Sequence, residues 1–504
     1  MKPPARNVTQ RSTALADRTV WLAVTGSVAA VEAVGLTREL LRHGAEVRIV
    51  ASAAALELVG RKALEFACGR PPVTEITGQV EHVTADVDLL VIAPCTASSL
   101  AKVVHGIGDT PPTLFALTLL GAGVPLLVAP AMDGRMAESP VVLDNLRKAR
   151  KIATVLDPLL EEGKAKLPSR EVIAAWACRL AGQRDLTGQR LLVIGGGTAE
   201  PLDDVRVLGN RSSGRMAVAL VEEAFARGAE AELWLGSATV TPGNWIPLER
   251  FTTLAELVAK VETLGEWDTV LLPAALADFR PPRTPGKIAS GRRLMLELEP
   301  APKLLPLLRN AHAGKLVAFK LASDASDDEL IKKAGAPLEY ADLVVANSAD
   351  AMEAEAARIV LVSRDGTRLV AVVRGPRADT VRVARIRGDD SERVTGATRS
   401  RPLNLDDDPS RRIRDVAWTS TTTLAVLNRL TDVSAKVVTV GVDGSPGGLD
   451  GIITTLSGAT ALVGSPARGT RVYAVTDTGL ADLNATVRGP RVLDEGLTFV
   501  TYAG

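Results

Sequence analysis

One pattern in this chain fits few folds: a buried strand, a turn of small residues, a helix and a second strand. In its first occurrence the apolar run 20–24 leads to the turn Gly26-Ser27. A helical segment over 29–43 follows, and a strand over 46–50 completes the unit. Continuous apolar runs are typical of strands buried on both faces. Their alternation with helices predicts a parallel sheet covered by helices on both sides.

A second copy of the pattern follows in the next part of the chain. A strand over 190–194, three glycines and a helix over 214–227 lead to a strand over 231–235. The phrase RGAEAELW in this copy echoes HGAEVRIV in the first. The predicted fold is therefore α/β, with two tandem doubly wound parallel-sheet domains. We expect a flavodoxin-like domain over 19–182 and a Rossmann-like domain over 187–353.

The composition changes after about residue 354. Lysine nearly disappears, and short strands alternate with Asp-Gly turns such as Asp365-Gly366 and Asp443-Gly444. That alternation is typical of antiparallel meanders. We expect residues 354–504 to form an antiparallel β tail of two to three propeller-like blades, with a polar linker over 389–410. Fewer than four blades cannot close a ring, so this part would be incomplete by itself.

Charge and cysteine content exclude several classes of function. The 59 basic and 59 acidic residues balance, and aromatic residues make up only 3% of the chain. Neither polyanion binding nor base stacking is favoured, so we expect no nucleic-acid partner. The three cysteines cannot form a disulfide framework and fit a reducing compartment.

Two segments could be mistaken for membrane or export signals. The longest uncharged stretch, 113–132, contains two glycines and a proline, which predict a helix, a turn and a buried strand. The basic N-terminus before the apolar run 20–30 resembles a signal peptide, but the turn Thr25-Gly26-Ser27 interrupts that run. The predicted localisation is cytoplasmic, without a membrane partner.

Short motifs lie at the ends of strands in the first domain. The turn Thr25-Gly26-Ser27 opens a helix, whose free N–H groups and dipole favour a phosphate. Four further motifs are Glu81-His82, APCTASS at 93–99, HGIGDTP at 105–111 and APAM at 129–132. Over about residues 19–175 this set resembles the flavin-dependent decarboxylase half of a bifunctional family in coenzyme A biosynthesis. Its members are phosphopantothenoylcysteine decarboxylases and phosphopantothenate–cysteine ligases in one chain.

The resemblance implies an FMN site built at subunit contacts, and hence a homo-oligomer. It assigns the phosphate side of the FMN to Gly26, Ser27 and Ser52. It assigns the isoalloxazine ring to Pro94, Thr96 and Ala97. It makes His82 the catalytic histidine. Flavin oxidation of the substrate thiol creates an electron sink for loss of CO₂, and an imidazole suits the proton transfers near neutral pH.

The first domain departs from the family pattern at two places. Asp133 stands where many members have Asn after Pro-Ala-Met, and its charge would repel a substrate carboxylate unless the side chain is protonated or turned away. The substrate clamp reads Glu-Glu-Gly-Lys-Ala-Lys over 161–166, without the cysteine of many bacterial members and like archaeal ones. We expect Lys164 or Lys166 to bind the substrate phosphate or to donate the last proton.

The second domain carries a different phosphate-type motif. GGGTAEP over 195–201 follows a strand, Asp203-Asp204-Val205-Arg206 comes next, and NRSSGRM over 210–216 opens a helix. Glycines let a backbone approach a phosphate, and hydroxyl groups and helix N–H groups bind its oxygens. The spacing matches neither a Walker A motif nor GxGxxG, which weakens the ATPase and dehydrogenase alternatives.

These residues resemble the ligase half of the same family over about 187–350. The resemblance makes Asn210 and Lys287 catalytic, with Asn210 stabilising an acyl-nucleotide intermediate. It assigns nucleotide and substrate binding to Arg206, Ser212, Ser213, Gly214, Ala275, Asp278, Phe319 and Lys320. A nucleotide triphosphate, usually CTP in bacteria, activates the carboxylate with release of pyrophosphate, and Mg²⁺ and lysines neutralise the charge. No metal ligand is identifiable from the sequence.

The ligase motif also has departures. Ala289-Ser290 replaces a lysine pair, and Ala322-Ser323 replaces Glu-Thr. Lys303 replaces the Asp of the family's Pro-Asp-Ile-Leu motif. From about Arg358 the chain resembles, more weakly, the propeller part of LpqB-type lipoproteins. Two alternatives therefore stay open: a non-catalytic flavin-binding regulatory protein, and an exported propeller-type lipoprotein fragment fused to a vestigial enzyme.

Overall fold

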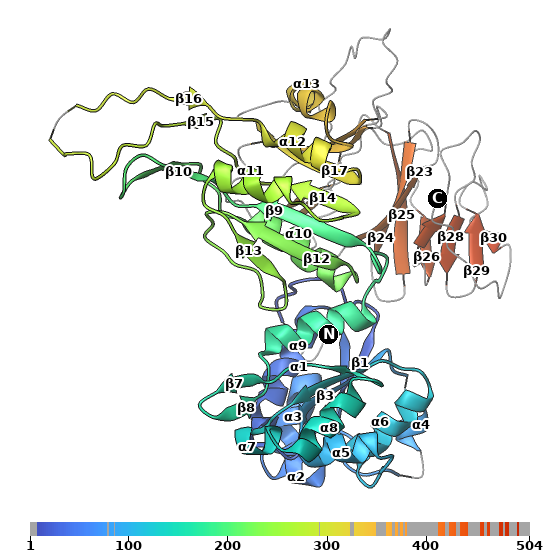
Figure 1. The fold of residues 1–504 in the computed structure, drawn as a ribbon. Helices are drawn as coiled ribbons and strands as arrows, with labels where there is room; N and C mark the ends of the chain where they lie inside the picture. Colours follow the sequence, from blue (N-terminus) through green and yellow to red (C-terminus); the bar gives the residue numbers. More distant parts are fainter. Residues whose placement is uncertain are drawn as a thin grey trace. The chain divides into compact units, whose positions relative to one another are not determined.

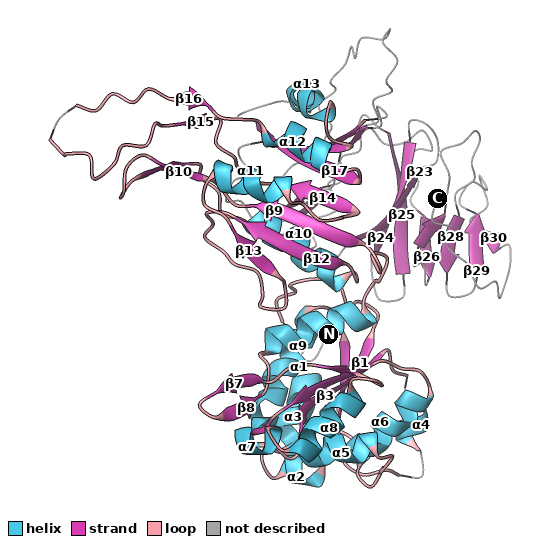
Figure 2. Ribbon diagram, viewed as in Figure 1, coloured by secondary structure: helices cyan, strands magenta, loops and turns pink. Residues whose placement is uncertain are grey.

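The computed structural model describes residues 8–364, except 78–79, 85, 292, 323–326 and 349–358, and beyond them only strands. The chain divides into two compact units. The first contains residues 1–200, 214–254 and 265–269, and the second contains 201–213, 255–264 and 270–504. Figures 1 and 2 show the helices and strands of both.

A five-stranded sheet forms the centre of the N-terminal part of the first unit. Its order is β2-β1-β3-β4-β6, and all the pairs are parallel. The strands are β1 (Thr19–Val24), β2 (Glu46–Ala51), β3 (Leu89–Cys95), β4 (Leu126–Pro130) and β6 (Thr154–Val155). This order reverses direction beside β1, which is the position where doubly wound folds bind ligands. The predicted parallel sheet is confirmed.

Helices cover both faces of this sheet, so that its strands separate two apolar clusters. Val20, Leu22 and Val24 of β1 lie in one cluster, and Trp21 and Ala23 lie in the other. The helical segments of this part are η2 (Val28–Glu32), α1 (Ala33–Arg42), α2 (Ala53–Leu56), α3 (Arg61–Cys68), α4 (Glu81–Thr84), α5 (Ala97–Val104), α6 (Pro111–Gly121), α7 (Gly134–Ala137), α8 (Pro140–Ala149) and α9 (Arg170–Ala181). The helix expected over 29–43 thus begins as the 3-10 segment η2 and continues as α1.

A second parallel group in the first unit consists of β13 (Leu248–Arg250), β12 (Glu230–Leu235) and β9 (Arg190–Gly195), with α10 (Arg215–Ala226) packed against it. Arg179 of α9 donates to the carbonyl oxygens of Phe225 and Ala229, at 2.8 and 2.7 Å. These carbonyls lie at the C-terminal end of α10, where a cation is favoured. Helices α9 and α10 are therefore fastened together within this unit.

The second unit contains the strand order β14-β17-β18-β19-β20, with the last two strands antiparallel to their neighbours. Its strands and helices are β11 (Val207–Gly209), β14 (Thr269–Leu272), β15 (Phe279–Arg280), β16 (Glu299–Pro300), α12 (Leu304–Ala311), β17 (Lys315–Ala322), α13 (Asp327–Leu338), β18 (Leu343–Ser348), β19 (Ile359–Ser363) and β20 (Arg368–Val370). Strand β10 (Ala199–Pro201) and helix α11 (Leu254–Glu262) begin in the first unit.

The tail consists of antiparallel strands, as its turn pattern predicts. Two four-stranded sheets have their strands in chain order. Their strands are β23 (Arg412–Trp418), β24 (Thr423–Arg429), β25 (Ser434–Gly441) and β26 (Thr454–Ser457), then β27 (Ala461–Val463), β28 (Tyr473–Thr476), β29 (Gly479–Asp482) and β30 (Arg491–Val492). A short pair, β21 (Val373–Gly375) and β22 (Ala378–Thr380), precedes them. A propeller arrangement stays a prediction, and the expected linker over 389–410 lies outside the described residues.

Across the described residues, the structure contains no helix with the length and apolar character needed to cross a bilayer.

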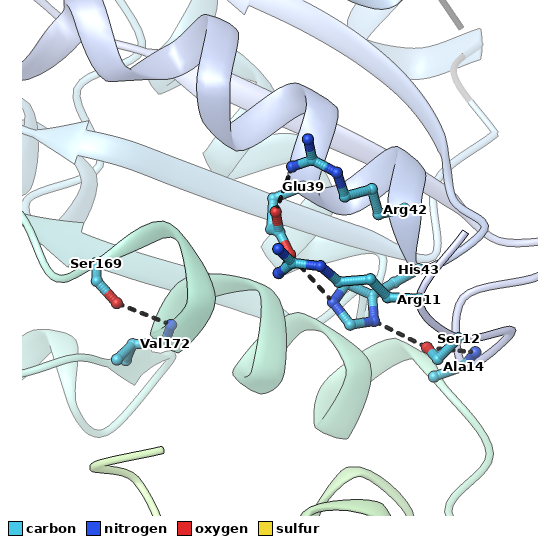
Figure 3. A network of polar contacts seen from close by, with 8 residues as sticks. All are labelled: Arg11, Ser12, Ala14, Glu39, Arg42, His43, Ser169 and Val172. Carbon is cyan, nitrogen blue, oxygen red and sulfur yellow. Dashed lines mark hydrogen bonds and ion pairs between the residues drawn. The ribbon is translucent and has the colours of Figure 1, made fainter. Parts of the chain in front are cut away.

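A network of charged residues fastens the N-terminal segment onto α1 (Figure 3). The carboxylate of Glu39 is only 3% exposed and pairs with Arg11 at 2.5 Å and with Arg42 at 2.7 Å. On the same helix, His43 Nε2 lies 3.6 Å from Glu39, and its Nδ1 lies 2.8 Å from Ser12 Oγ. Ser169 caps α9 nearby by accepting from the N–H of Val172.

This network predicts a pH-dependent stability. Burial lowers the pKa of His43 below its ordinary value of 6.5; Glu39 opposes the shift, and the cations Arg11 and Arg42 reinforce it. The unfolded chain therefore binds more protons than the folded chain just below pH 6.5. Stability is fully present above that pH and falls as the pH is lowered through this window. We expect thermal melts between pH 7.5 and 5.5 to show a smaller decrease for His43→Asn than for the wild type. Equal slopes would contradict this prediction.

Candidate functional site

Loops at the carboxyl ends of three neighbouring strands form the first candidate site. Thr25, after β1, is 1% exposed, and its hydroxyl group donates to the carbonyl oxygen of Pro94 at 2.7 Å. The same hydroxyl oxygen accepts from the N–H of Thr96 at 3.1 Å. Thr25 therefore joins the loop after β1 to the loop after β3, which brings the sequence-predicted residues of these two loops together. Thr25 was predicted as part of the phosphate-type turn but not as a residue of the flavin site.

The loop after β2 approaches the same place. Ser52 is buried, its N–H donates to the carbonyl oxygen of Val24 at 3.0 Å, and its hydroxyl group caps α2. A Cβ atom on Gly26 would lie 2.5 Å from the Cβ atom of Ala54. Glycine is thus required at position 26 by the close approach of two loops.

Three serine and threonine side chains cap helices at this edge of the sheet. Ser27 caps η2, Ser52 caps α2 and Thr96 caps α5, and Ala97 is the first residue of α5. Hydroxyl groups and backbone N–H groups converge where the strand order reverses. The structure therefore brings together all six residues predicted to bind a flavin phosphate and ring.

His82 lies on α4, which packs against α6. Its ring centroid lies 6.4 Å from that of Phe115 of α6, and its Nδ1 atom is buried without a hydrogen-bond partner. Buried polar atoms in native proteins are almost always partnered. The Nδ1 atom of His82 thus has the capacity to bind a partner from outside the chain.

Cys95 lies near these loops but is a buried thiol. It is 1% exposed, and burial raises the pKa of its thiol to about 12. A thiol with this pKa is neither a nucleophile nor an effective proton donor near neutral pH. Cys95 is a packing residue, as expected from its position in a continuous apolar run.

The substrate clamp is a small antiparallel sheet of β5 (Met132–Asp133), β8 (Lys164–Lys166) and β7 (Leu159–Glu161). Lys166 donates to Glu161 and Glu162, each at 2.8 Å, and these hydrogen bonds raise its pKa. Lys164 is exposed and faces Asp133 across the β5–β8 ladder. Asp133 Oδ1 accepts from the N–H of Arg135 and so caps α7. Asp133, which departs from the family pattern, therefore serves as a helix cap, and it lies opposite Lys164.

Among the residues of the second predicted motif, those in the first unit form a tight glycine-lined turn. Gly196 has a φ of 77°, and a Cβ there would lie 2.9 Å from the backbone of Gly236 and Ser237. A Cβ on Gly195 would lie 2.1 Å from the Cβ atom of Ala217 in α10. Gly214 precedes α10, whose N-terminus has no side-chain cap. Backbone N–H groups in the first turn of a helix favour an anion, and here no N-cap side chain competes for them. Ser212 and Ser213 directly precede it in the chain.

In the second unit, Asn210 is bound to the loop after β14. Its amide nitrogen donates to the carbonyl oxygens of Ala275 at 3.0 Å and Leu276 at 2.7 Å. The family resemblance predicts that this amide donates to a reaction intermediate. In the structure, the amide nitrogen donates to the backbone at residues 275–276. Asn210 and Ala275 are thus brought together.

A buried carboxylate joins Arg206 to the loop that carries Lys287. The side chain of Asp203 is 0% exposed and accepts from Arg206 and from the N–H of Ile288. The N–H bonds to this carboxylate and the Arg206 cation outweigh the cost of burial and lower the pKa of Asp203. The sequence analysis assigned Asp203 no role, because its partner Ile288 is 85 residues away and no local pattern indicates the contact.

Three other predicted residues have different partners from Asp203, Arg206 and Asn210. Asp278 forms an ion pair with Lys303, the residue that departs from the family pattern. Phe319 and Lys320 lie on β17 opposite Val345 and Ala346 of β18. Among the described residues, no group of three or more His, Cys, Asp or Glu side chains could hold a metal ion.

Comparison with known proteins identifies three families along the chain. They are Flavoprotein over 8–181, DNA/pantothenate metabolism flavoprotein C-terminal domain over 186–381, and Lipoprotein LpqB beta-propeller domain over 324–488.

Three individual proteins are similar to this chain over at least half of its length. A "Coenzyme A biosynthesis bifunctional protein" from Thermococcus kodakarensis is 41% identical over 70% of this chain and 91% of its own length. A protein of the same description from Methanocaldococcus jannaschii is 34% identical over 67% and 85%. A "Cysteine/Cysteine sulfinic acid decarboxylase" from an unknown prokaryotic organism is 32% identical over 52% of this chain and 76% of its own.

Proposed function

Because this chain belongs to the family of bifunctional coenzyme A biosynthesis proteins, we propose that it makes 4′-phosphopantetheine in two steps from 4′-phosphopantothenate and cysteine. It carries the family's two activities, a phosphopantothenate–cysteine ligase and an FMN-dependent phosphopantothenoylcysteine decarboxylase. The finer proposal concerns which residues perform each step and which nucleotide is used. For the decarboxylase, the observation that carries it is the pair of hydrogen bonds by which Thr25 joins the loops after β1 and β3, close to the switch point of the sheet.

The residues at this edge fit a flavin mononucleotide. Ser27, Ser52 and the backbone around Gly26 would hold its phosphate, while Pro94, Thr96 and Ala97 would line its ring. When bound, the flavin supplies the two-electron chemistry that makes loss of CO₂ feasible. The orphaned Nδ1 atom of His82 supports a role for this imidazole in holding or moving a proton of the substrate.

For the ligase step, the uncapped first turn of α10, with Ser212, Ser213 and Gly214 before it, would bind the nucleotide phosphates. Asn210, Arg206 and Lys287 would act on the acyl group and on the charge that develops there. We expect CTP to be the nucleotide. Since Mg²⁺ is usually held by one or two carboxylates together with substrate phosphates, we expect it to arrive with the nucleotide.

The clamp predicts different effects for its two lysines. Lys166 is bound by two glutamates, whereas Lys164 is exposed beside Asp133. We expect Lys164→Ala to raise the KM of the decarboxylase for phosphopantothenoylcysteine by about tenfold, since one lost charge-assisted hydrogen bond costs about 1.5–3 kcal/mol. Lys166→Ala is the matched control, and we expect a smaller effect because its ammonium group is already engaged. Steady-state kinetics check this; unchanged rates in both variants would remove these lysines from the reaction.

Exposed apolar side chains support a homo-oligomer. Val28 and Val31 on η2, next to the Gly26-Ser27 turn, are 76% and 53% exposed. Apolar groups clustered on a surface mark interaction sites. We propose that subunits meet near the flavin edge, and that the protein works in the cytoplasm on small-molecule substrates, without nucleic-acid or membrane partners.

The proposal is tested with the purified chain. The protein should be yellow, and pyrophosphate release should require phosphopantothenate, cysteine, CTP and Mg²⁺ together. A yellow protein without turnover would favour the non-catalytic regulatory alternative. A colourless, inactive protein would favour a vestigial enzyme.

A further inference from the structure

Asp203 is the buried carboxylate at the centre of the ligase cluster, and its two oxygens have separate tasks. Oδ1 accepts from the backbone N–H groups of Val205 and Arg206, at 2.8 and 2.6 Å. Oδ2 accepts from Arg206 Nη1 and from the N–H of Ile288, both at 3.0 Å. Thus Oδ1 forms the local turn, whereas Oδ2 binds a loop distant in sequence.

The contacts of Oδ2 belong to a wider clasp between two loops, 202–206 and 283–288. The N–H of Thr284 donates to the carbonyl oxygen of Leu202 at 3.0 Å, and the N–H of Asp204 donates to that of Gly286 at 3.3 Å. Arg206 Nη1 also donates to the carbonyl oxygen of Ile288 at 3.1 Å. Within this clasp, Asp203 is the fully buried side chain.

Two residues of the ligase reaction are tied to this carboxylate at once. Arg206 is held through its side chain, and Lys287 is held through the backbone of the next residue, Ile288. We propose that Asp203 is a positioning residue of the ligase, which fixes the guanidinium of Arg206 and the loop of Lys287 in one arrangement for the acyl substrate. This inference rests on the ligase function proposed above and adds a residue to it. Asp203 itself touches neither substrate nor nucleotide in this account.

The decisive variant is Asp203→Asn. An asparagine offers one acceptor oxygen, and in either orientation its NH₂ group faces two N–H donors that Asp203 now satisfies. If the oxygen keeps the local turn, the contacts to Arg206 Nη1 and to Ile288 are lost. Because displacement of reacting groups by about 1 Å can cost about 100-fold in rate, we expect a fall of about that size in the ligase kcat/KM. The KM for phosphopantothenate should rise, and decarboxylation of supplied phosphopantothenoylcysteine should be unchanged.

Asp342→Asn is the matched control within the same unit. Asp342 accepts from the N–H of Leu316 at 2.8 Å and from Arg309 at 3.1 Å, and these residues join α12 to the start of β17. It contacts no residue assigned to the reaction. Its partners Arg309, Leu316 and Arg364 have no assigned role in the reaction, so we expect its ligase kinetics to stay within about twofold of the wild type even where stability falls.

A double-mutant cycle separates positioning from general loss of structure. If Asp203 acts through Arg206 and Lys287, Asp203→Asn should cost much less in an Arg206→Ala or Lys287→Ala background than in the wild type. A merely structural role would cost the same factor in every background. Faster tryptic cleavage after Lys287 in Asp203→Asn gives a second readout that does not depend on turnover.

The outcomes are distinguishable. Normal ligase kinetics of Asp203→Asn, or an equal loss in all backgrounds, would overturn the positioning role while wild-type turnover leaves the proposed function intact. A wild-type chain without ligase turnover would overturn the proposed function instead. A loss of about 100-fold confined to the ligase, with strong coupling to Arg206 and Lys287, would establish the inference.

Discussion

Replacing His82 with Asn should lower the decarboxylation rate by about 1,000-fold, within the range attributed to general acid–base catalysis. The reason is the buried Nδ1 atom, which has no partner in the protein and therefore remains available for a substrate proton. Asparagine keeps a polar group of similar reach but cannot exchange a proton near neutral pH. The flavin spectrum and the ligase rate should be unchanged, because neither depends on this imidazole. Rates are measured as CO₂ release from phosphopantothenoylcysteine.

His105→Asn is the matched control for His82. His105 also lies in the first unit, but its Nε2 atom is 3.2 Å from Asn145 Oδ1, and its backbone forms the C-cap of α5. Its polar interactions are thus satisfied within the protein, and we expect nearly full activity after substitution. Should both variants decarboxylate at the wild-type rate, His82 has no part in the chemistry.

Asn210→Asp should stop amide formation by the ligase, with a loss of about 100- to 1,000-fold, comparable to removal of one preorganised donor. In the structure the Asn210 amide donates to the carbonyl oxygens of Ala275 and Leu276. A carboxylate there would face two carbonyl oxygens and would also repel the anionic acyl substrate. The measurement is formation of phosphopantothenoylcysteine from phosphopantothenate, cysteine and CTP.

Asn310→Asp provides the same chemical change at an exposed position of α12, and it should leave the ligase rate unchanged. Decarboxylase activity of the same Asn210→Asp preparation controls for folding. A wild-type ligase rate in Asn210→Asp would show that this amide neither holds the Ala275 loop nor acts on the acyl group during turnover.

Much of the fold was predictable because its signals are local. The apolar run 89–93 was predicted as a buried strand and forms most of β3 (Leu89–Cys95), and glycines such as Gly44 mark where helices end. The alternation of strands with Asp-Gly turns likewise predicted the antiparallel tail. The break between η2 and α1 was not predicted, because no proline or glycine marks it within 28–33.

The site was only partly predictable for a physical reason. Motifs identify the loops, but contacts between segments far apart in the chain decide which side chains meet. Thr25 and Pro94 are 69 residues apart, and Asp203 and Ile288 are 85 residues apart. Two departures from the family pattern are explained by interactions that the structure shows. Asp133 caps α7, and Lys303 pairs with Asp278.

In the proposed function, one chain ligates cysteine to phosphopantothenate and then decarboxylates the product. The most direct test follows CO₂ from cysteine labelled at its carboxyl carbon. We expect labelled CO₂ only when phosphopantothenate, CTP and Mg²⁺ are all present, with 4′-phosphopantetheine formed in equal amount. Labelled CO₂ from cysteine alone would indicate a direct cysteine decarboxylase, like one of the relatives. That result, or no labelled CO₂ from the complete mixture, would contradict the account.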